Sequence, residues 1–327
     1  MIAAWQKRGP AALALLPLAF FFSVLVSLRR RAYRAGWLRR VRLPVPVVVV
    51  GNIAVGGAGK TPIVLALVQA MQAAGRHPGI VSRGYRGSVE GVREVRADDG
   101  AEQVGDEPLL LKGRCGCPVF VGRDRAAAGA ALLAAYPDCD VIVSDDGLQH
   151  YRLARDVEIA VIDGRMLDNH WMLPAGPLRE SPARLAGVDA IVRNGDVAVA
   201  VHGVPTFQMT LVGDRFVRLD APDQCAAADD LRGARLHAVA GIGNPRRFFD
   251  HLAALGLAVV PHAFPDHHRY AAPDLDFQGD AILATEKDGV KLRGLAKLPV
   301  WVLPVEARIE PDLARYVMEK LDGRPPA

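Results

Sequence analysis

The chain has 327 residues, about twice the length of a typical domain; half of them are apolar and 23% are charged. This composition allows large buried cores and excludes a disordered chain, a collagen-like repeat and a small disulfide scaffold. The net charge is +4, but seven arginines fall between Arg29 and Arg42 with no acidic residue among them, so the remaining chain is slightly acidic. That distribution argues against a nucleic-acid-binding surface spread over the whole protein, and we expect no nucleic-acid partner. No obligate protein partner is inferred from the sequence.

The N-terminal region contains an apolar run, residues 11–28, with no charged residue. As a helix it would be about 27 Å long, just short of a ~30 Å hydrocarbon core, and a buried core helix is the alternative. Arginines at 29–31 follow the run in place of a signal-peptidase site, so we expect the segment to be retained. By the positive-inside rule the rest faces the cytoplasm, with Tyr33 and Trp37 at an anionic lipid surface. Residues 1–43 are therefore predicted to form a membrane anchor helix with a basic segment, either spanning the membrane or lying in it, with the remaining chain in the cytoplasm.

From residue 44 onward, short apolar runs alternate with helical patterns. This rhythm predicts an α/β fold with a mainly parallel sheet and helices on both faces. We place a nucleotide-binding domain at 44–200 and a smaller α/β domain at 201–327. Strands are predicted at 47–50, 80–82, 119–121, 141–144, 157–162, 207–211, 237–240, 259–263, 281–284 and 300–303. Helices are predicted at 62–74, 125–136, 246–255 and 311–321.

The strongest motif is VVVVGNIAVGGAGKTP, residues 47–62, in which a buried strand leads through a glycine-rich turn into a helix. Small residues let backbone N–H groups surround phosphates, and the helix N-terminus adds partial positive charge. Lys60 would reach the β- and γ-phosphates, and the Thr61 hydroxyl would ligate Mg²⁺. The phosphate-loop pattern G-x-x-x-x-G-K-[ST] has glycine where this chain has Ala54. The predicted nucleotide contacts in this loop are Ala54, Val55, Gly56, Gly57, Ala58, Gly59, Lys60 and Thr61.

Several polar clusters follow predicted strands. The run 141–146 ends in Asp145 and Asp146, either of which can supply the carboxylate on the magnesium side. Adjacent residues of a strand point to opposite faces, so only one of them need face the metal.

Taken alone, residues 105–108 (GDEP) indicate a surface turn. Residues 266–268 (DHH), with His262, have no strong zinc spacing and suit a catalytic His–Asp pair better. The cysteines include a C-x-C at 115–117 but no disulfide framework or zinc spacing, which indicates a structural role and a reducing compartment.

Together these motifs resemble the tetraacyldisaccharide 4'-kinase family. GNIAVGGAGKTP, SRGYRG, GDEP, SDDGLQH, GPLRE, AGIGNPRRF, FPDHHRY and ATEKDGVK occur in that family's order, over most of the chain. The resemblance implies a phosphate-loop domain with a smaller α/β domain and the nucleotide between them. It also implies transfer of the γ-phosphate of ATP, with Mg²⁺, to the 4'-hydroxyl of tetraacyldisaccharide 1-phosphate, a lipid A precursor.

The resemblance also assigns roles by motif. It implies Asp106 as the catalytic base, supported by His267, with Asp145 and Asp146 serving the metal and the active-site network. The second domain would reach the nucleotide through Gly243, Asn244, Thr285, Lys287 and Asp288. The substrate side of the site would be formed by Tyr85, Glu107, Gln149, His150, Arg179 and Asp266.

Two other classes of function stay open at this point. One is a membrane-anchored phosphate-loop ATPase or GTPase switch that acts on protein partners. Guanine-specific switches usually carry Asn/Thr-Lys-x-Asp, whereas residues 285–288 (TEKD) have an extra residue before the lysine. The other is a non-catalytic membrane scaffold with a vestigial loop, against which the intact Lys60, Thr61 and Asp145 argue.

Overall fold

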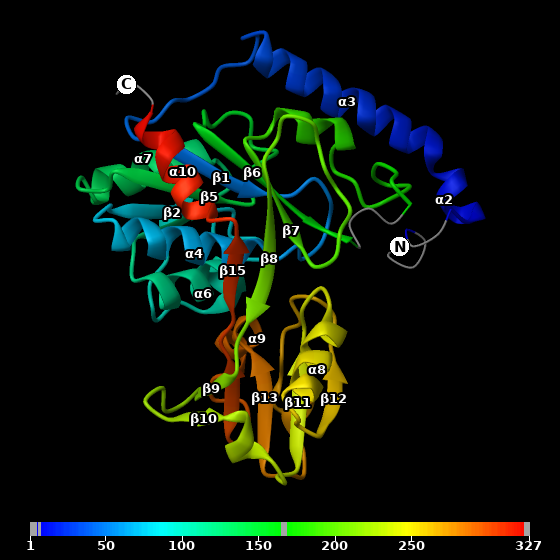
Figure 1. Cartoon of the computed structure of the whole chain (residues 1–327), viewed down its shortest axis with the longest axis vertical. Coiled ribbons are helices and arrows are strands. Elements are labelled where there is room, and N and C mark those ends of the chain that lie inside the picture. Colours follow the sequence, from blue (N-terminus) through cyan, green and yellow to red (C-terminus); the bar gives the residue numbers. More distant parts are fainter. Residues whose placement is uncertain (1–4, 6–7, 165–168, 324–327) are drawn as a thin grey trace.

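Two sheets organise the chain, and an N-terminal helix lies across the larger one (Figure 1). The structure is a computed structural model that describes residues 5, 8–164 and 169–323. It confirms the predicted α/β fold, because both sheets are mainly parallel and alternate with helices along the chain. We call the unit around the nine-stranded sheet the first domain and the unit around the six-stranded sheet the second domain.

The first sheet has the strand order β15-β8-β7-β6-β1-β5-β2-β4-β3. All neighbours from β8 to β4 are parallel, and the edge strands β15 and β3 are antiparallel to their partners. The central strands are buried on both faces, which explains their uninterrupted apolar sequences. The strands are β1 (Val47–Gly51), β2 (Pro78–Ser82), β3 (Val92–Glu94), β4 (Val119–Gly122), β5 (Val141–Asp145), β6 (Val157–Asp163), β7 (Ala190–Asn194), β8 (Thr206–Val212) and β15 (Glu306–Glu310).

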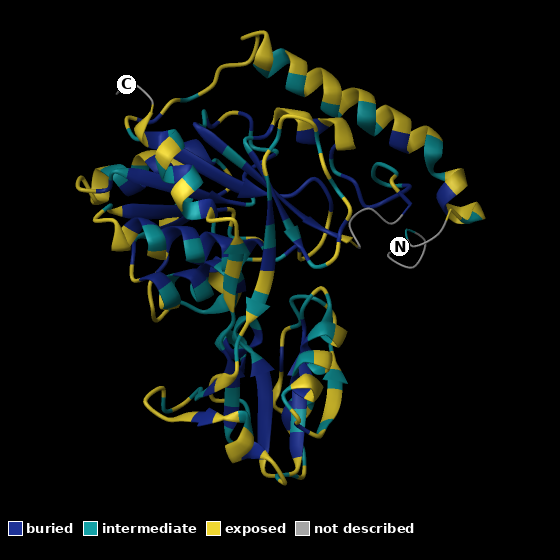
Figure 2. Cartoon of the chain, in the orientation of Figure 1, coloured by how far each residue is buried: buried dark blue, intermediate teal, exposed yellow. Residues whose placement is uncertain are grey.

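Helices cover this sheet and enclose its core, which appears as continuous dark blue in Figure 2. The helix α4 packs between α6 and α10, and α7 packs against β2, β3 and β4. The bounds are α4 (Lys60–Ala73), α5 (Ala101–Val104), α6 (Asp106–Cys115), α7 (Arg125–Ala135) and α10 (Leu313–Asp322), with a 3-10 turn η2 (Pro182–Gly187). Three cysteines, Cys115, Cys117 and Cys139, are buried in this domain as free thiols.

The second sheet has the order β10-β9-β14-β13-β11-β12, with β14, β13, β11 and β12 parallel. The short strands β9 and β10 complete it in antiparallel pairings. Its strands are β9 (Arg215–Arg218), β10 (Cys225–Ala227), β11 (Leu236–Ala240), β12 (Val259–Ala263), β13 (Ala281–Thr285) and β14 (Val300–Leu303). Its helices are α8 (Pro245–Ala254) and α9 (Glu286–Leu292), with 3-10 turns η3 (Ala228–Leu231) and η4 (Ala272–Leu275).

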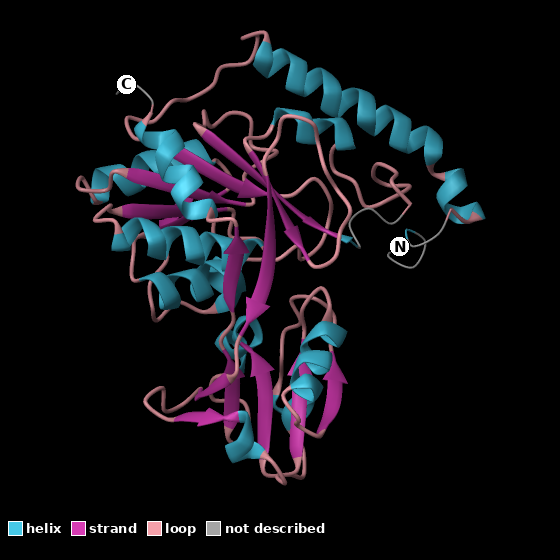
Figure 3. Ribbon diagram, viewed as in Figure 1, coloured by secondary structure: helices cyan, strands magenta, loops and turns pink. Residues whose placement is uncertain are grey.

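The chain passes between the domains twice, through β8 on the way out and β15 on the way back (Figure 3). Because β8 pairs with β7 and β15 pairs with β8, both strands belong to the first sheet. The sequence placed everything after residue 200 in the smaller domain. The sheets instead divide the chain after β8 and again before β15, and α10 packs on α4 in the first domain. Sequence pattern shows a strand but not its partner strand, which is why this return was missed.

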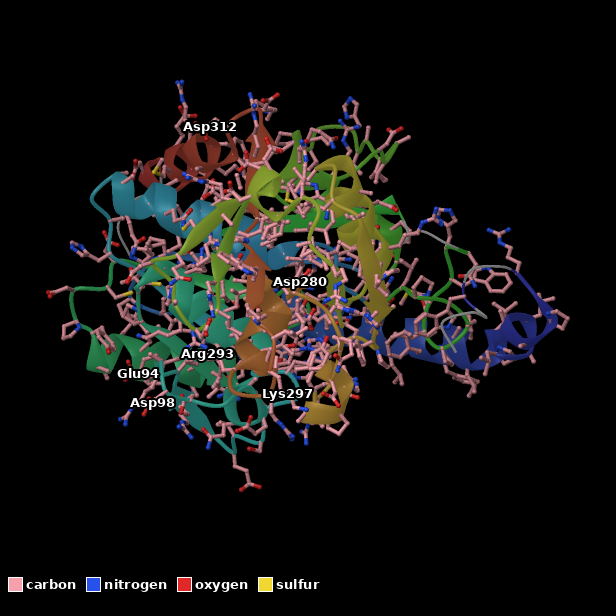
Figure 4. All side chains as sticks on the ribbon, turned by 90° about the horizontal axis from the view of Figure 1, so that it is seen from below. Glu94, Asp98, Asp280, Arg293, Lys297 and Asp312 are labelled. Atoms are coloured by element: carbon pink, nitrogen blue, oxygen red, sulfur yellow. The ribbon has the colours of Figure 1, made fainter. Side chains whose placement is uncertain are left out.

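The N-terminal apolar run forms two helices, α2 (Pro10–Ala14) and α3 (Leu16–Arg34), which meet at Leu15. Only residues 16–28 of α3 are free of charge, about 20 Å of helix, because four arginines complete its last two turns. Across the described residues, no helix is both long enough and apolar enough to cross a membrane. The helix projects from the rest of the molecule in the view from below (Figure 4).

Candidate active site

The phosphate-loop motif has the geometry that its sequence predicts. The strand β1 ends at Gly51, and α4 begins at Lys60 directly after Gly59, whose φ of 86° is left-handed. The loop is held from within by the Asn52 side chain, which donates to the Gly56 carbonyl (3.2 Å). Its backbone N–H groups therefore lie at the start of a buried helix, where anions are stabilised.

Ala54, the departure from the glycine pattern, lies at a position that does not require glycine. It is fully buried and forms an antiparallel bridge with Leu178, so its backbone is extended. The next residue, Val55, donates its N–H to the Pro177 carbonyl (2.9 Å). This first part of the loop is anchored to the segment after β6, and the glycines that follow carry the turn.

A cavity of about 510 Å³ opens beside the loop, between the two domains. Of the loop residues predicted to bind nucleotide, Gly57, Ala58, Gly59, Lys60 and Thr61 line it, whereas Ala54, Val55 and Gly56 are not among its walls. From the second domain, Gly243, Asn244, Thr285 and Lys287 line the opposite wall. The two segments that resemblance linked to the nucleotide thus face the loop across the cavity.

Further residues of this cavity were missed from sequence. Asn194 donates to the Ala58 carbonyl (2.8 Å) and accepts from Arg247 (2.7 Å), so it connects the loop to α8 of the second domain. Asn194 is the last residue of β7, a strand that was not predicted from the sequence. Had the strand been predicted, a polar residue at its carboxyl end would have indicated a site residue. The remaining missed walls are mostly apolar or aromatic side chains, among them Leu65, Leu211, Ile242, Phe248 and Leu303.

Asp145 and Asp146 have opposite environments, as adjacent residues at a strand end should. The Asp145 side chain is 1% exposed and accepts from Ser82 Oγ through Oδ2 (3.2 Å), but its Oδ1 has no hydrogen-bond partner among the described residues. Burial, followed by the charge of Glu107, raises the pKa of Asp145 to about 7. The charge of Lys60 and the Ser82 hydrogen bond lower this pKa, but they do not outweigh burial.

Asp146, by contrast, is surrounded by positive charge. Its carboxylate lies 3.5 Å from Lys60 Nζ and 3.0 Å from Arg179 Nη1. Burial alone would raise the pKa of Asp146, but the charges of Lys60 and Arg179 outweigh it and hold the pKa well below its usual range. Asp146 therefore holds Lys60 and Arg179 in place at the mouth of the loop.

Asp106 and His267 are 161 residues apart in sequence and in direct contact in the fold. Nδ1 of His267 lies 2.8 Å from one carboxylate oxygen of Asp106 and 2.9 Å from the other, so the imidazole donates to the carboxylate. Burial would raise the pKa of Asp106, but the hydrogen bond from His267 and the charges of Lys287 and Lys291 lower it. Asp106 is thus a buried carboxylate held in its ionised form.

The surface turn predicted for residues 105–108 is wrong. Asp106 and Glu107 form the first turn of α6, where carboxylates are stabilised by the helix N-terminus and Pro108 is tolerated. Gly105, with a φ of 92°, turns the chain into this helix. Asp106 is only 5% exposed because the second domain covers it.

The second domain places two lysines of α9, one helical turn apart, beside Asp106 and Glu107. Lys287 Nζ lies 2.9 Å from Glu107 Oε1, 3.5 Å from Asp266 Oδ1 and 3.4 Å from His267 Nε2. Lys291 Nζ lies 3.8 Å from Asp106 Oδ2. Lys291 was missed from sequence, although its four-residue spacing from Lys287 places both on one helix face.

The residues expected on the substrate side take different positions. Tyr85 is half exposed, with its ring 5.3 Å from that of His267. Gln149 lies 3.4 Å from Arg179 through Oε1 and donates to Glu180 (2.8 Å) through Nε2. The His150 side chain accepts a hydrogen bond from the backbone N–H of Arg125 (3.3 Å). Burial of His150, followed by the charge of Arg125, lowers the pKa of His150 to about 4.

The histidines near residue 267 have three separate partners. His262 contacts His237 (2.9 Å) and stacks on Phe277, His267 contacts Asp106, and His268 contacts Asp274 (3.1 Å). These pairings separate the side chains that would have formed a metal cluster. His267 forms its hydrogen-bonded pair with Asp106 of the first domain, while Asp266 Oδ1 lies 3.8 Å from its other ring nitrogen, Nε2. A catalytic role for the His–Asp pair stays a prediction.

Asp288 occupies a structural position under the nucleotide-side loop of the second domain. Its fully buried carboxylate accepts from Gly241 N (2.9 Å), Thr285 Oγ1 (2.7 Å) and Tyr270 Oη (3.0 Å). It is not among the cavity walls, so its effect on that cavity passes through the 241–244 loop.

We expect Asp288→Ala to lower the free energy of unfolding by about 3 kcal/mol, because the buried Gly241 N–H and Tyr270 hydroxyl and the partly buried Thr285 hydroxyl lose their acceptor. Urea denaturation followed by circular dichroism measures this. Asp276→Ala is the control variant: Asp276 forms an exposed pair with Lys297, and such a pair contributes about 0–1 kcal/mol. Equal loss in the two variants would contradict the structural role of Asp288.

Comparison with known proteins gives a consistent match. A family model described as tetraacyldisaccharide-1-P 4'-kinase (LpxK) matches residues 11–322. A tetraacyldisaccharide 4'-kinase from Azoarcus sp. (strain BH72) is 57% identical, with 99% of this chain and 96% of that protein aligned. One from Aromatoleum aromaticum is 54% identical over 99% and 98% of the two chains. The crystal structure of LpxK from Aquifex aeolicus in complex with ATP superposes with a TM-score of 0.83 at 30% identity, covering 95% of this chain and 99% of that one.

Proposed function

The chain belongs to the tetraacyldisaccharide-1-P 4'-kinase family, and from this premise we propose how its own residues carry out the reaction. The enzyme is a kinase that transfers the γ-phosphate of ATP to the 4'-hydroxyl of tetraacyldisaccharide 1-phosphate in lipid A biosynthesis. The observation that carries the residue assignment is the contact between Asp106 and His267, which joins the two domains beside the phosphate loop.

We propose that ATP occupies the 510 Å³ cavity with its phosphates on the loop. The N–H groups of residues 57–61 and the Lys60 ammonium would stabilise charge on the β- and γ-phosphates. Asp146, by pairing with Lys60 and Arg179, would hold both cations toward the transferred phosphoryl group. The apolar side chains on the far wall, with Phe248 among them, suit the base of the nucleotide.

The residues of the loop fit Mg²⁺, the ion that accompanies ATP. Asp145 offers a buried, unsatisfied carboxylate oxygen, and Thr61 lines the cavity at the start of α4. We infer that these two residues hold the ion. The sequence predicts the same pair, a hydroxyl at the end of the phosphate loop and an acid at the end of a neighbouring strand. When bound, Mg²⁺ neutralises charge on the phosphates and orients them.

We assign Asp106 as the base that accepts the proton of the 4'-hydroxyl, with His267 as the residue that orients it. A sugar hydroxyl is a poor nucleophile, and a positioned carboxylate accelerates its attack by about 10²–10⁴-fold. Tyr85 lies beside His267, Arg179 pairs with Asp146, and Gln149 contacts Arg179. These three side chains suit contacts with the disaccharide. Glu107 and Asp266 act mainly by holding Lys287.

The phosphotransfer assay that tests this function uses γ-labelled ATP, Mg²⁺ and tetraacyldisaccharide 1-phosphate in mixed micelles. We expect label in the lipid. Label released only as free phosphate would contradict the kinase and favour a switch ATPase. Selectivity for GTP is not expected, because Asp288, the last residue of the TEKD segment, is fully buried by its contacts with Gly241 and Tyr270.

The enzyme works on a membrane lipid, and we propose that α3 attaches it to the cytoplasmic face of the inner membrane. Leu18, Phe21, Leu25 and Leu28 are spaced three, four and three residues apart, and each is more than half exposed. Figure 2 shows exposed and partly exposed positions along the whole helix. Such an apolar stripe followed by arginines suits a helix that lies in the interfacial region.

The two aromatic residues predicted as interfacial anchors differ. Trp37 is 83% exposed and remains available to the interface. The ring of Tyr33 lies 6.0 Å from that of Tyr151, so it helps to hold α3 against the first domain.

We expect the double substitution Phe21→Glu and Leu25→Glu to weaken binding to lipid vesicles by about tenfold or more, since each buried large apolar side chain contributes about 1.5–3 kcal/mol. ATP affinity should not change, because α3 does not line the nucleotide cavity. Vesicle co-sedimentation and nucleotide titration measure the two quantities. Val260→Glu, at another exposed apolar position, is the control. Equal loss of vesicle binding and ATP binding would contradict the assignment.

A further inference from the structure

A second cavity, of about 300 Å³, lies where the end of α3 meets the first domain. It is at the amino ends of β6 and β7, the opposite edge of the sheet from the phosphate loop. Five arginines line it: Arg30, Arg34, Arg40, Arg155 and Arg184. The established reaction uses none of them.

The acidic residues of this cavity already have partners. Glu158 pairs with Arg155 through Oε1 (2.9 Å) and with Arg184 through Oε2 (2.6 Å). Asp189 pairs with Lys320 (2.5 Å) and accepts from the Glu158 N–H (2.8 Å). Asp156, the third acid, pairs with Arg42 (3.3 Å) and accepts from the Val47 N–H (2.9 Å). Within the described part of the chain, Arg30 and Arg34 have no ion pair.

Three guanidinium groups converge at one point on the cavity rim. A methyl group at Gly187 would lie 3.3 Å from Arg34 Nη2, 3.5 Å from Arg30 Nη2 and 3.7 Å from Arg184 Nη1. Arg184 is only 2% exposed, and its Nε makes no hydrogen bond with any described residue, although Glu180 lies 3.6 Å away. Burial, followed by the charges of Arg34 and Arg184, lowers the pKa of Arg30. The cluster thus has more donors than acceptors and would be stabilised by an anion.

The position of these arginines on α3 indicates the source of the anion. Arg30 and Arg34 are one turn apart and face the domain, whereas the apolar stripe of the same helix faces outward. The cavity therefore lies at the interface between α3, whose other face is exposed to the membrane, and the first domain. If α3 lies in the membrane surface, the anions nearest to this cavity are lipid headgroups.

We propose that the arginine cavity at the end of α3 binds the phosphate of an acidic membrane phospholipid. This rests on the proposed attachment of α3 to the membrane. Guanidinium groups bind phosphate oxygens with two parallel hydrogen bonds, and the excess of donors here supplies them. A bound headgroup would join α3 to the first domain and fix how the domain stands on the bilayer.

The 1-phosphate of the enzyme's own substrate has the same chemistry, but the structure separates the cavity from the catalytic cluster. Glu180 lies between them, 2% exposed, with Gln149 on the catalytic side (2.8 Å) and Arg184 on the cavity side (3.6 Å). A phosphate moving between the two regions would have to pass this buried carboxylate. Bulk phospholipid is therefore the occupant that the geometry favours.

The test compares two double variants with equal loss of charge. Arg30→Gln/Arg34→Gln removes the cavity arginines, and Arg29→Gln/Arg31→Gln removes two exposed arginines from the same turns that do not line the cavity. Binding is measured to phosphatidylcholine vesicles with and without one-fifth phosphatidylglycerol. We expect the first pair to lose about tenfold more affinity for the acidic vesicles than the second, with similar binding to neutral vesicles.

A third variant keeps every arginine. Gly187→Glu places a carboxylate beside Arg30, Arg34 and Arg184 at an exposed position, so it should fill the site and remove the preference for acidic vesicles. Melting temperature and ATP affinity verify that each variant is folded.

The outcomes separate the proposals. Equal losses in the two double variants would overturn the site and leave general surface attraction. A higher KM for tetraacyldisaccharide 1-phosphate in neutral micelles, found only for Arg30→Gln/Arg34→Gln, would assign the cavity to substrate and also overturn it. If the unmodified enzyme binds neither kind of vesicle, the attachment of α3 fails and the inference fails with it.

Discussion

Asp106→Asn is expected to lower kcat by about 10²–10⁴-fold while ATP affinity stays nearly unchanged. The substitution keeps the shape of the side chain and removes the basic oxygen, so the loss appears in the chemical step. Asp106 does not line the nucleotide cavity, which is why ATP binding should survive. Single-turnover transfer to tetraacyldisaccharide 1-phosphate and nucleotide titration measure the two quantities.

The control for this variant is a second Asp–His pair in the same region. Asp274 lies 3.1 Å from His268, but 32% of its side chain is exposed and it caps a 3-10 turn. Asp274→Asn should leave kcat within about twofold, since this pair does not touch the reacting groups. Activity of Asp106→Asn within tenfold of the unmodified enzyme would remove Asp106 as the base.

The pH dependence gives a further test of the same pair. A base acts when deprotonated, and the pKa of Asp106 is lowered, so protonation of this base should reduce kcat/KM only below the ordinary carboxyl range, near 4. His267→Gln removes the hydrogen bond that lowers this pKa. The acid limb of the profile should therefore move to higher pH in this variant, and an unmoved limb would contradict the orienting role of His267.

Lys60→Met is the second variant with a large expected effect, a fall in kcat of about 10²–10³-fold. Lys60 is 8% exposed at the first position of α4 and lies 3.5 Å from Asp146. Methionine fills similar space without the ammonium, so charge that develops on the phosphates loses its nearest fixed cation. Transfer of label from γ-labelled ATP to lipid measures the effect.

The control for Lys60 is Lys112→Met, on α6 of the same domain. Lys112 Nζ donates to the Cys117 carbonyl (3.5 Å), and Lys112 does not line the nucleotide cavity. Its activity should be unchanged. If Lys60→Met retains most of its kcat, the loop amides and the metal suffice for charge stabilisation, and our assignment of Lys60 is wrong.

The sequence by itself determined the local parts of this protein. The run of valines at 47–50 is typical of a strand buried on both faces, and the glycines before Lys60 allow the turn that precedes a helix. These are effects between residues a few positions apart, so they can be read without the fold. The end of β5 at Asp145 follows by the same reasoning, and the order of all eight family motifs identified the kinase family.

Only the tertiary structure decided what these parts meet. Asp106 appeared to be in a surface turn because burial by a domain 161 residues away leaves no trace in its neighbours. The return of β15 to the first sheet and the convergence of Arg30, Arg34 and Arg184 have the same cause. Pairing and burial depend on contacts between segments distant in sequence, and pattern within one segment does not encode its partner.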